Sequence, residues 1–338
     1  MNKKIGLLIP YSGEFVDLKR ILLNPFAQYA HDNDYELLKE FIGPGSEKEV
    51  NKAIDKLFYQ EDVDIIIGYV GYRVAITLFD KLRRNPDKIF IHLSLGEVIP
   101  YTQSRINYPD NYLLFSSDAW KTIAFLGAWV ARKFPAADCM ICTSLYDAGY
   151  SLVESFRVGY HSIYAKPIQV CTLNNNPNVN DVIGLFNEIN RLRPGHLHVT
   201  LCGRELDLFI NQFSQFIDYT PSVSFSFPVS LKYIETKHAA FKNVFTAVLE
   251  STIPKYIADF SESPFSVLFQ YLTQQVIKWL DGDEIPSGNA ISIVEMNLIE
   301  RQFISADVTG QLPVSLNAEF NHSAENAVAI WQNPYLCI

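Results

Sequence analysis

Short apolar runs of strand length alternate with helical patterns along the first third of the chain. These runs are continuous, as in residues 5–9 and 65–67, and do not alternate with polar residues. A strand that helices cover on both faces is apolar throughout, whereas a strand with one solvated face alternates. Strands are expected at residues 5–9, 35–42, 63–68 and 88–94, with a helical pattern after each. The second of these helices has a capping-box pattern, Ser46 followed by Glu49. The alternation predicts a parallel, doubly wound α/β sheet.

The same alternation restarts after a boundary near residues 111–118. At 338 residues the chain is long enough to bury two cores. Further strands are expected at residues 138–143, 167–173, 197–201, 223–229 and 242–250. The last part is expected to contain an amphipathic helix at 264–280, strand pieces at 290–304 and a hairpin at 308–330. We therefore expect a second α/β lobe of similar design.

Charge and hydropathy exclude some classes of function. The net charge is -9 and no basic stripe is present, which argues against a nucleic-acid partner. No apolar run approaches the roughly 20 residues that span a bilayer, so we expect no direct membrane insertion. The chain enters its first strand without a hydrophobic signal core and cleavage site. The expected location is the cytoplasm, or the periplasm if an export signal has been removed.

The cysteines and histidines are interpreted as structural residues. Five cysteines are scattered through strand-like segments, which is typical of reduced, buried thiols. Cys139 and Cys142 form a C-x-x-C, but residues three apart on a strand face opposite sides. His196 and His198 share one face of a strand, yet no third ligand has a suitable spacing. His92 is expected in the core. No metal or cofactor is predicted.

The first strand and its loop carry a resemblance to a known family. Apolar residues 5–9 followed by Pro10, Tyr11, Ser12 and Gly13 are similar to the opening of the type I periplasmic binding proteins, in the branch of branched-chain amino-acid and amide receptors. The loops at 68–71 and 145–151, the helix at 264–280 and residues 308–312 resemble the family in the same order. The resemblance covers nearly the whole chain.

The resemblance implies a specific organisation. Two doubly wound parallel-sheet lobes would be joined by a three-strand hinge, with a ligand cleft between them. Lobe 1 is expected to comprise residues 1–116 and 251–304, and lobe 2 residues 117–250 and 305–338. The chain would cross between the lobes near Ser116, Glu250 and Ile304.

Loops at the carboxyl ends of the strands would line this cleft, since ligands of open α/β sheets bind there. Such a site, rich in tyrosine with a few polar groups, suits a small polar or aromatic solute. Three departures from the family put an amino-acid ligand in doubt, one of them Ala148-Gly149 in place of a Tyr-Gly in the second-lobe loop. Gly71 and Tyr72 replace a small hydroxyl residue, and no acidic residue lies near Phe227–Ser230. The predicted ligand-binding residues are Tyr11, Ser12, Tyr69, Gly71, Tyr72, Ser94, Gly96 and Glu97 from lobe 1, and Tyr146, Asp147, Tyr150, Arg204 and Glu205 from lobe 2.

Several of these residues have an alternative interpretation. Arg204 either grips a ligand anion with its planar fork or pairs with Glu205 or Asp207. Glu97 either accepts hydrogen bonds from a ligand amine or hydroxyl or is a solvated loop carboxylate. Tyr69 and Tyr72 either line the cleft or pack on the lobe, and Asp147 is also placed to cap a helix.

The function predicted from this resemblance is binding of a small solute by hinge closure, as the receptor of an ABC importer that docks on its membrane subunits. The alternative is a cytoplasmic sensor of the amide-regulator type, which would report to a regulatory protein. Catalysis is not expected, because the sequence contains no Gly-x-Ser-x-Gly, Walker-type loop or H-E-x-x-H. An enzyme acting on a small acid or amide in the same cleft is the alternative from another class.

Overall fold

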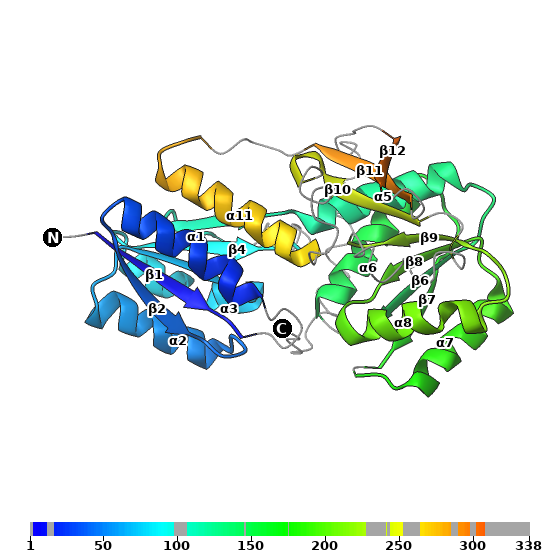
Figure 1. The fold of residues 1–338 in the computed structure, drawn as a ribbon, viewed down its shortest axis with the longest axis horizontal. Coiled ribbons are helices and arrows are strands. Elements are labelled where there is room, and N and C mark those ends of the chain that lie inside the picture. The colour runs from blue at the N-terminus through cyan, green and yellow to red at the C-terminus, as the bar shows by residue number, and fades with distance from the viewer. Residues whose placement is uncertain are drawn as a thin grey trace.

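The computed structural model describes residues 3–11, 17–97, 107–144, 147–174, 176–227, 241, 244–252, 264–284, 290–297 and 302–307. The hairpin expected at 308–330 lies outside these residues. Within them, no helix combines the length and the hydropathy that crossing a membrane requires. The described chain forms two sheets with flanking helices, which confirms the predicted α/β class (Figure 1).

The first sheet is parallel throughout, in the order β2-β1-β3-β4-β5. Alternate residues of its strands enter two different cores. Leu7 of β1 packs in a cluster with α1, whereas Leu8 packs in a cluster with α2, α3 and α4. Both faces of the sheet are therefore covered. The elements are β1 (Lys4–Ile9), α1 (Leu18–Asp32), β2 (Glu36–Phe41), α2 (Glu47–Asp55) with a π-helical turn (Lys56–Gln60), β3 (Ile65–Tyr69), α3 (Tyr72–Thr77), α4 (Phe79–Arg84), β4 (Ile89–Ser94) and β5 (Tyr112–Ser116).

The second sheet has the order β12-β11-β10-β9-β8-β6-β7. Its strands from β6 to β10 are parallel, and β11 and β12 are antiparallel additions at one edge. Cys139 packs toward α5 and α6, and Cys142 packs toward α7 and α8, so the C-x-x-C is split between two faces. The elements are α5 (Ala119–Lys133), β6 (Cys139–Ser144), α6 (Asp147–His161), β7 (Gln169–Leu173), α7 (Val179–Leu192), β8 (His196–Thr200), α8 (Gly203–Phe216), β9 (Ser222–Phe225), β10 (Val244–Leu249), a 3-10 turn (Glu250–Thr252), β11 (Ile291–Asn297) and β12 (Gln302–Asp307).

The described residues show three passages of the chain between the two sheets. It leaves the first sheet after β5 for α5, and it leaves the second sheet after β10 for α11 (Pro264–Leu280), which packs on α1, β4 and β5. It then returns to the second sheet at β11, which pairs with β10. Residues 251–304 were expected in the first lobe, with the last crossing near Ile304, yet residues 291–297 belong to the second sheet. The pairing of β11 corrects both assignments, because this crossing falls between α11 and β11.

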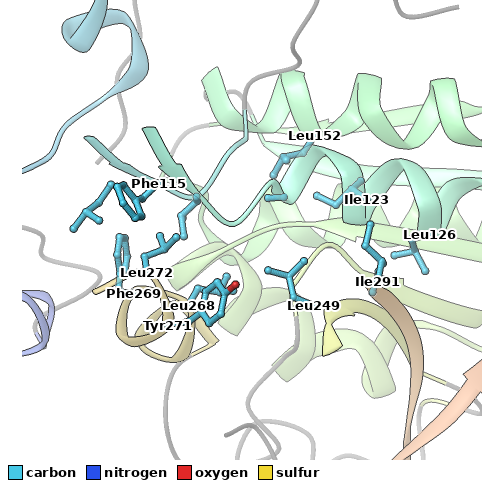
Figure 2. Packing of buried hydrophobic residues seen from close by; sticks show 14 of the residues in the cluster. Phe115, Ile123, Leu126, Leu152, Leu249, Leu268, Phe269, Tyr271, Leu272 and Ile291 are labelled. Atoms are coloured by element: carbon cyan, nitrogen blue, oxygen red, sulfur yellow. The ribbon is translucent and has the colours of Figure 1, made fainter. Parts of the chain in front are cut away.

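One hydrophobic cluster extends from the first sheet to the second. Phe269 and Leu272 of α11 lie beside Phe115 of β5, and the cluster continues to Leu249 and Ile291 of the second sheet (Figure 2). Burial of aliphatic and aromatic surface of this kind is the main stabilising contribution to a fold. The elements on either side of the crossings, β5, β10, α11 and β11, therefore share one core.

Helices α5 and α6 approach each other at two glycines. A Cβ atom added at Gly127 would lie 2.2 Å from the carbonyl oxygen of Phe156, and one added at Gly159 would lie 1.8 Å from that of Ala124. The backbones are therefore in direct contact. α5 is correspondingly buried on nearly all sides, between α6 and strands β10 and β11.

Gly159→Ala should destabilise the protein, because the two helices must separate to admit the methyl group. Overpacking of this kind costs about 1–3 kcal/mol. Gly184→Ala in α7 is the matched control, since nothing lies within 4 Å of its added Cβ. The control should gain up to about 1 kcal/mol from helix propensity. Urea unfolding measures both variants, and a stabilised Gly159→Ala variant would contradict the close helix contact.

Three buried histidines have polar partners. His92 Nε2 lies 2.8 Å from the Val70 carbonyl oxygen and must donate to it, so Nδ1 accepts from the Tyr112 hydroxyl at 2.5 Å. His196 Nε2 and His198 Nδ1 contact Ser224 Oγ at 2.8 and 2.9 Å. His198 Nε2 lies 3.1 Å from Ser226 Oγ. Burial lowers the pKa of His92 to about 4 and that of His196 to about 3, and lowers the pKa of His198 as well.

Acid should therefore unfold the protein through these histidines. A histidine of the unfolded chain has a pKa of about 6.5, whereas the buried imidazole rings of the native protein stay neutral until the pH is much lower. Between these values the unfolded state binds more protons. Stability should then fall with decreasing pH by up to about 1.4 kcal/mol per pH unit for each histidine. Urea unfolding from pH 7 to 4.5 measures this slope. His92→Gln should reduce this slope by the contribution of one histidine. An unchanged slope would contradict the lowered pKa of His92.

Candidate functional site

The carboxyl ends of the strands in each sheet point to the segments that join the two lobes. The chain leaves β5 for the second lobe and β10 for the first, and the neighbouring strands β1, β3, β4, β6, β8 and β9 run parallel to them. All these carboxyl ends therefore lie on the edges from which the chain crosses. Phe227, just after β9, contacts Phe265 in the first turn of α11 with a ring-centroid distance of 4.9 Å. The two carboxyl edges are thus joined by side-chain packing.

Tyr69 and Glu97 stand at the carboxyl edge of the first sheet. Tyr69 ends β3, and its ring meets Phe269 of α11 edge-on at 4.6 Å between centroids. Glu97 follows β4, and its Oε2 atom is buried without a hydrogen-bond partner among the described residues. Burial raises the pKa of the Glu97 carboxyl. Burial, and secondarily the nearby Glu97 carboxylate, raises the pKa of Tyr69.

The loop that carries Glu97 is fixed against the start of α5. The Gly96 amide donates to Ser94 Oγ at 3.0 Å, and Ser117 Oγ donates to the Leu95 carbonyl at 2.7 Å. The Trp120 amide donates to the Gly96 carbonyl at 2.9 Å. Gly96 has a φ of +69°, and a Cβ there would lie 2.6 Å from the Asp118 amide nitrogen. Only glycine suits this position, and Glu97 is held in one place as a result.

The remaining predicted residues of lobe 1 lie in different environments. Tyr11 is 72% exposed, and its amide donates to the Gly43 carbonyl at 2.7 Å. Gly71 precedes α3 as its N-cap. Tyr72 is buried, and its hydroxyl lies 2.5 Å from that of Tyr108, so it packs within the lobe. Ser12 lies outside the described residues. The structure thus brings Tyr69, Ser94, Gly96 and Glu97 together and places Tyr72 in the lobe interior.

On the second lobe, Ser144 and Glu205 connect the end of β6 to the first turn of α8. Ser144 Oγ donates to Glu205 Oε2 at 2.5 Å. The neighbouring Arg204 is exposed, and its Nη1 donates to Asn176 Oδ1 at 2.9 Å, a partner that neither interpretation of Arg204 anticipated. Asp147 and Tyr150 lie in the first turn of α6, but their side chains, like all of Tyr146, are outside the described part.

Sequence reasoning missed Ser144, Phe227, Phe265 and Phe269. Ser144 is the last residue of β6, and its position at the carboxyl end of a strand was a usable signal. The aromatic residues contact partners far away in the chain, so no local pattern identifies them. In the described part of the chain, no three His, Cys, Asp or Glu side chains are grouped to hold a metal ion.

A hollow of about 530 Å³ lies at the opposite, amino edge of the first sheet. Its lining is polar and includes Lys3, Tyr29, Asp34 and Asp281. Burial, with the adjacent Asp281 carboxylate, raises the pKa of Tyr29 to about 12. This hollow is shallow and its carboxylates are exposed, so we place the candidate site at the carboxyl edges.

Solved structures share this fold over nearly the whole chain. A solute-binding protein of an ABC transporter from R. palustris, in complex with benzoate, has a TM-score of 0.64 at 16% identity, covering 91% of this chain and 96% of that one. Another from Rhodopseudomonas palustris BisB5, in complex with 3,4-dihydroxybenzoic acid, has a TM-score of 0.66 at 14% identity, covering 92% and 97%. A branched-chain amino-acid transporter substrate-binding protein from Streptococcus pneumoniae, in complex with isoleucine, has a TM-score of 0.62 at 12% identity, covering 92% and 100%.

No sequence family matches the chain, and no curated protein is similar to it in sequence. At the identities above, the likeness establishes the fold, which is that of the type I periplasmic binding proteins. The predicted resemblance to this family is therefore confirmed for the fold.

Glu97→Gln should raise the free energy of unfolding of the ligand-free protein, relative to the wild type, more at pH 8 than at pH 4. Burial raises the pKa of the native Glu97 carboxyl, so this carboxyl keeps its proton at pH values where an unfolded glutamate, with a pKa of about 4.3, has ionised. Wild-type stability is therefore lost as the pH rises above the unfolded value, and glutamine has no such loss. Urea unfolding at both pH values measures the difference. An equal effect at pH 4 and pH 8 would contradict the burial of this carboxyl.

Proposed function

We propose that this chain is a solute-binding protein that holds a small polar or aromatic organic molecule between its lobes. The observation that carries the proposal is the position of Glu97 and Tyr69. A fixed loop holds a buried carboxyl oxygen, without a hydrogen-bond partner among the described residues, beside a tyrosine on the edge where open α/β sheets bind ligands. The fold shared with solute-binding proteins supports it.

Each lobe would supply different contacts. From the first lobe, Tyr69 offers aromatic surface and Glu97 a hydrogen-bond acceptor. From the second lobe, Arg204 offers donors and Glu205 an acceptor already oriented by Ser144. A solute that touches both edges at once binds the closed arrangement better than the open one, and so shifts the population toward closure.

The proposed role is that of the receptor for an ABC importer, whose membrane subunits would recognise the closed form. A sensor of the amide-regulator type would use the same closure to signal to a regulatory protein. Both roles require ligand binding without conversion of the ligand.

A binding screen tests the proposal. Purified protein is heated with amino acids, amides, amines and aromatic acids, and a ligand at about 100 times its dissociation constant should add roughly 2.7 kcal/mol to stability. Small-angle X-ray scattering should then show a smaller radius of gyration with the ligand than without it. NMR of the recovered ligand should show it unchanged. Chemical conversion would favour the enzyme alternative.

Arg204→Ala should weaken binding of the ligand found in this screen. Arg191→Ala is the matched control, because Arg191 is an exposed arginine of the same lobe that pairs with Glu188 on the outside of α7. Unchanged affinity in both variants would remove Arg204 from the site. The absence of any stabilising compound would contradict the proposed function.

A further inference from the structure

Two cysteines occupy the same register on neighbouring strands of the second sheet. Cys142 of β6 is the direct pairing partner of Cys171 of β7. Both side chains lie on one face of the sheet, since both pack in the hydrophobic cluster that α7 and α8 form with this face. Cys139, three residues before Cys142, packs on the opposite face and points away from the pair. Cys142 and Cys171 are therefore adjacent thiols on one surface.

The spacing of neighbouring strands nearly suits a disulfide. Strands of a sheet lie about 4.8 Å apart, which falls within the Cα separation of about 4.4–6.8 Å that disulfides bridge. The Cβ atoms of a disulfide lie about 3.5–4.5 Å apart, so the two strands would have to approach each other slightly. β7 can do so, because it is the edge strand at one end of the described sheet and its pairing partner is β6.

The two thiols differ in their access to solvent. Cys142 is fully buried, whereas Cys171 is half-buried. A reagent from solvent therefore reaches Cys171 first, and Cys142 reacts only through it. Burial and the Glu188 carboxylate raise the pKa of the Cys171 thiol, and Arg191 opposes this shift. A thiol with a raised pKa provides little thiolate at neutral pH, so the reaction is expected to be slow.

We propose that Cys142 and Cys171 are a modification site, a dithiol that small disulfides convert reversibly into an interstrand disulfide. The Cys171 thiolate attacks one sulfur of the small disulfide, forms a mixed disulfide and expels a thiolate. The Cys142 thiol then loses its proton, attacks the Cys171 sulfur and expels the second thiolate. The two protein thiols thus give up two electrons and two protons, and the small disulfide becomes two thiols.

The reaction is reversible for a geometric reason. The two strands must approach each other to form the bond, so the bond is strained, and a strained disulfide is easily reduced. A small thiol therefore restores the two cysteines by the same steps in reverse order. A pair of cysteines that served only as small apolar side chains would show neither reaction.

The disulfide would hold the edge strand of the second lobe in place. β7 (Gln169–Leu173) has exposed residues along most of its length. Separation of such a strand from β6 disturbs few buried contacts, and strands of this kind open at low cost. Cys171 is the middle residue of β7, so a covalent bond there restrains the whole strand. The backbone amides of β7 should exchange with deuterium more slowly in the disulfide form.

Mass spectrometry of the full chain tests this proposal. Native protein is equilibrated in mixtures of oxidised and reduced glutathione, alkylated, digested without reduction and analysed. Two peptides joined through Cys142 and Cys171 are expected where oxidised glutathione predominates, and they should disappear as the share of reduced glutathione rises. Hydrogen–deuterium exchange of the same samples measures the protection of β7.

Cys171→Ser is the decisive variant and should abolish the joined peptides. Cys142→Ala should do the same, and it should also retain glutathione on Cys171, because no second thiol is present to displace it. Cys202→Ser is the matched control, since Cys202 is the other half-buried cysteine of the described chain, and it should form the disulfide like the wild type. Urea unfolding verifies that each variant is folded.

Three results would overturn the proposal. These are alkylation of both thiols at every glutathione ratio, glutathione that stays on Cys171 of the wild type without further reaction, and a disulfide between a different pair of cysteines. Each would leave Cys142 and Cys171 as packing residues only. Equal exchange of the β7 amides in the two forms would contradict the restraint of the edge strand.

Discussion

The shared hydrophobic cluster around α11 is the constraint on which the rest of the structure depends. Phe115 from the first sheet and Leu249 and Ile291 from the second belong to the same buried cluster as Phe269 and Leu272 of α11. The elements that flank the crossings belong to this cluster, so the carboxyl edges of both sheets are kept close together. The proposed site between the lobes depends on that packing more than on any single polar contact.

Polar groups inside the protein fall into two kinds. The histidines of β4 and β8 lie in apolar surroundings but are hydrogen-bonded to serine, tyrosine and carbonyl groups, and they stabilise one arrangement of neighbouring strands. Glu97 lies in the loop that follows β4, a few residues beyond His92, and its Oε2 atom has no hydrogen-bond partner among the described residues. Other buried polar atoms of the described chain, such as His196 Nδ1, also lack a partner, so the proposal of a ligand contact at Glu97 rests on its position at the carboxyl edge of the sheet.

Local sequence patterns predicted the positions of the helices and strands well. They predicted less well which strands pair with each other. The capping box of Ser46 and Glu49 is present, with both reciprocal hydrogen bonds, because it depends only on residues three apart. The continuous apolar runs became the parallel strands. Residues 291–297 were assigned to the wrong lobe, since the sequence of an antiparallel strand gives no local sign of its partner. Within the site, Glu97 was expected from its loop position, but its burial and the contact of Tyr69 with Phe269 depend on a helix that is distant in the chain.

The glycine contact between α5 and α6 bears on how the two lobes can move. Because the backbones touch at Gly127 and Gly159, sliding or rolling of one helix over the other is blocked, and α5 and α6 form a single stiff slab. α5 begins directly after the crossing that follows β5. If the lobes close around a solute as proposed, α5 and α6 would therefore move together, and the motion would have to arise outside this pair of helices.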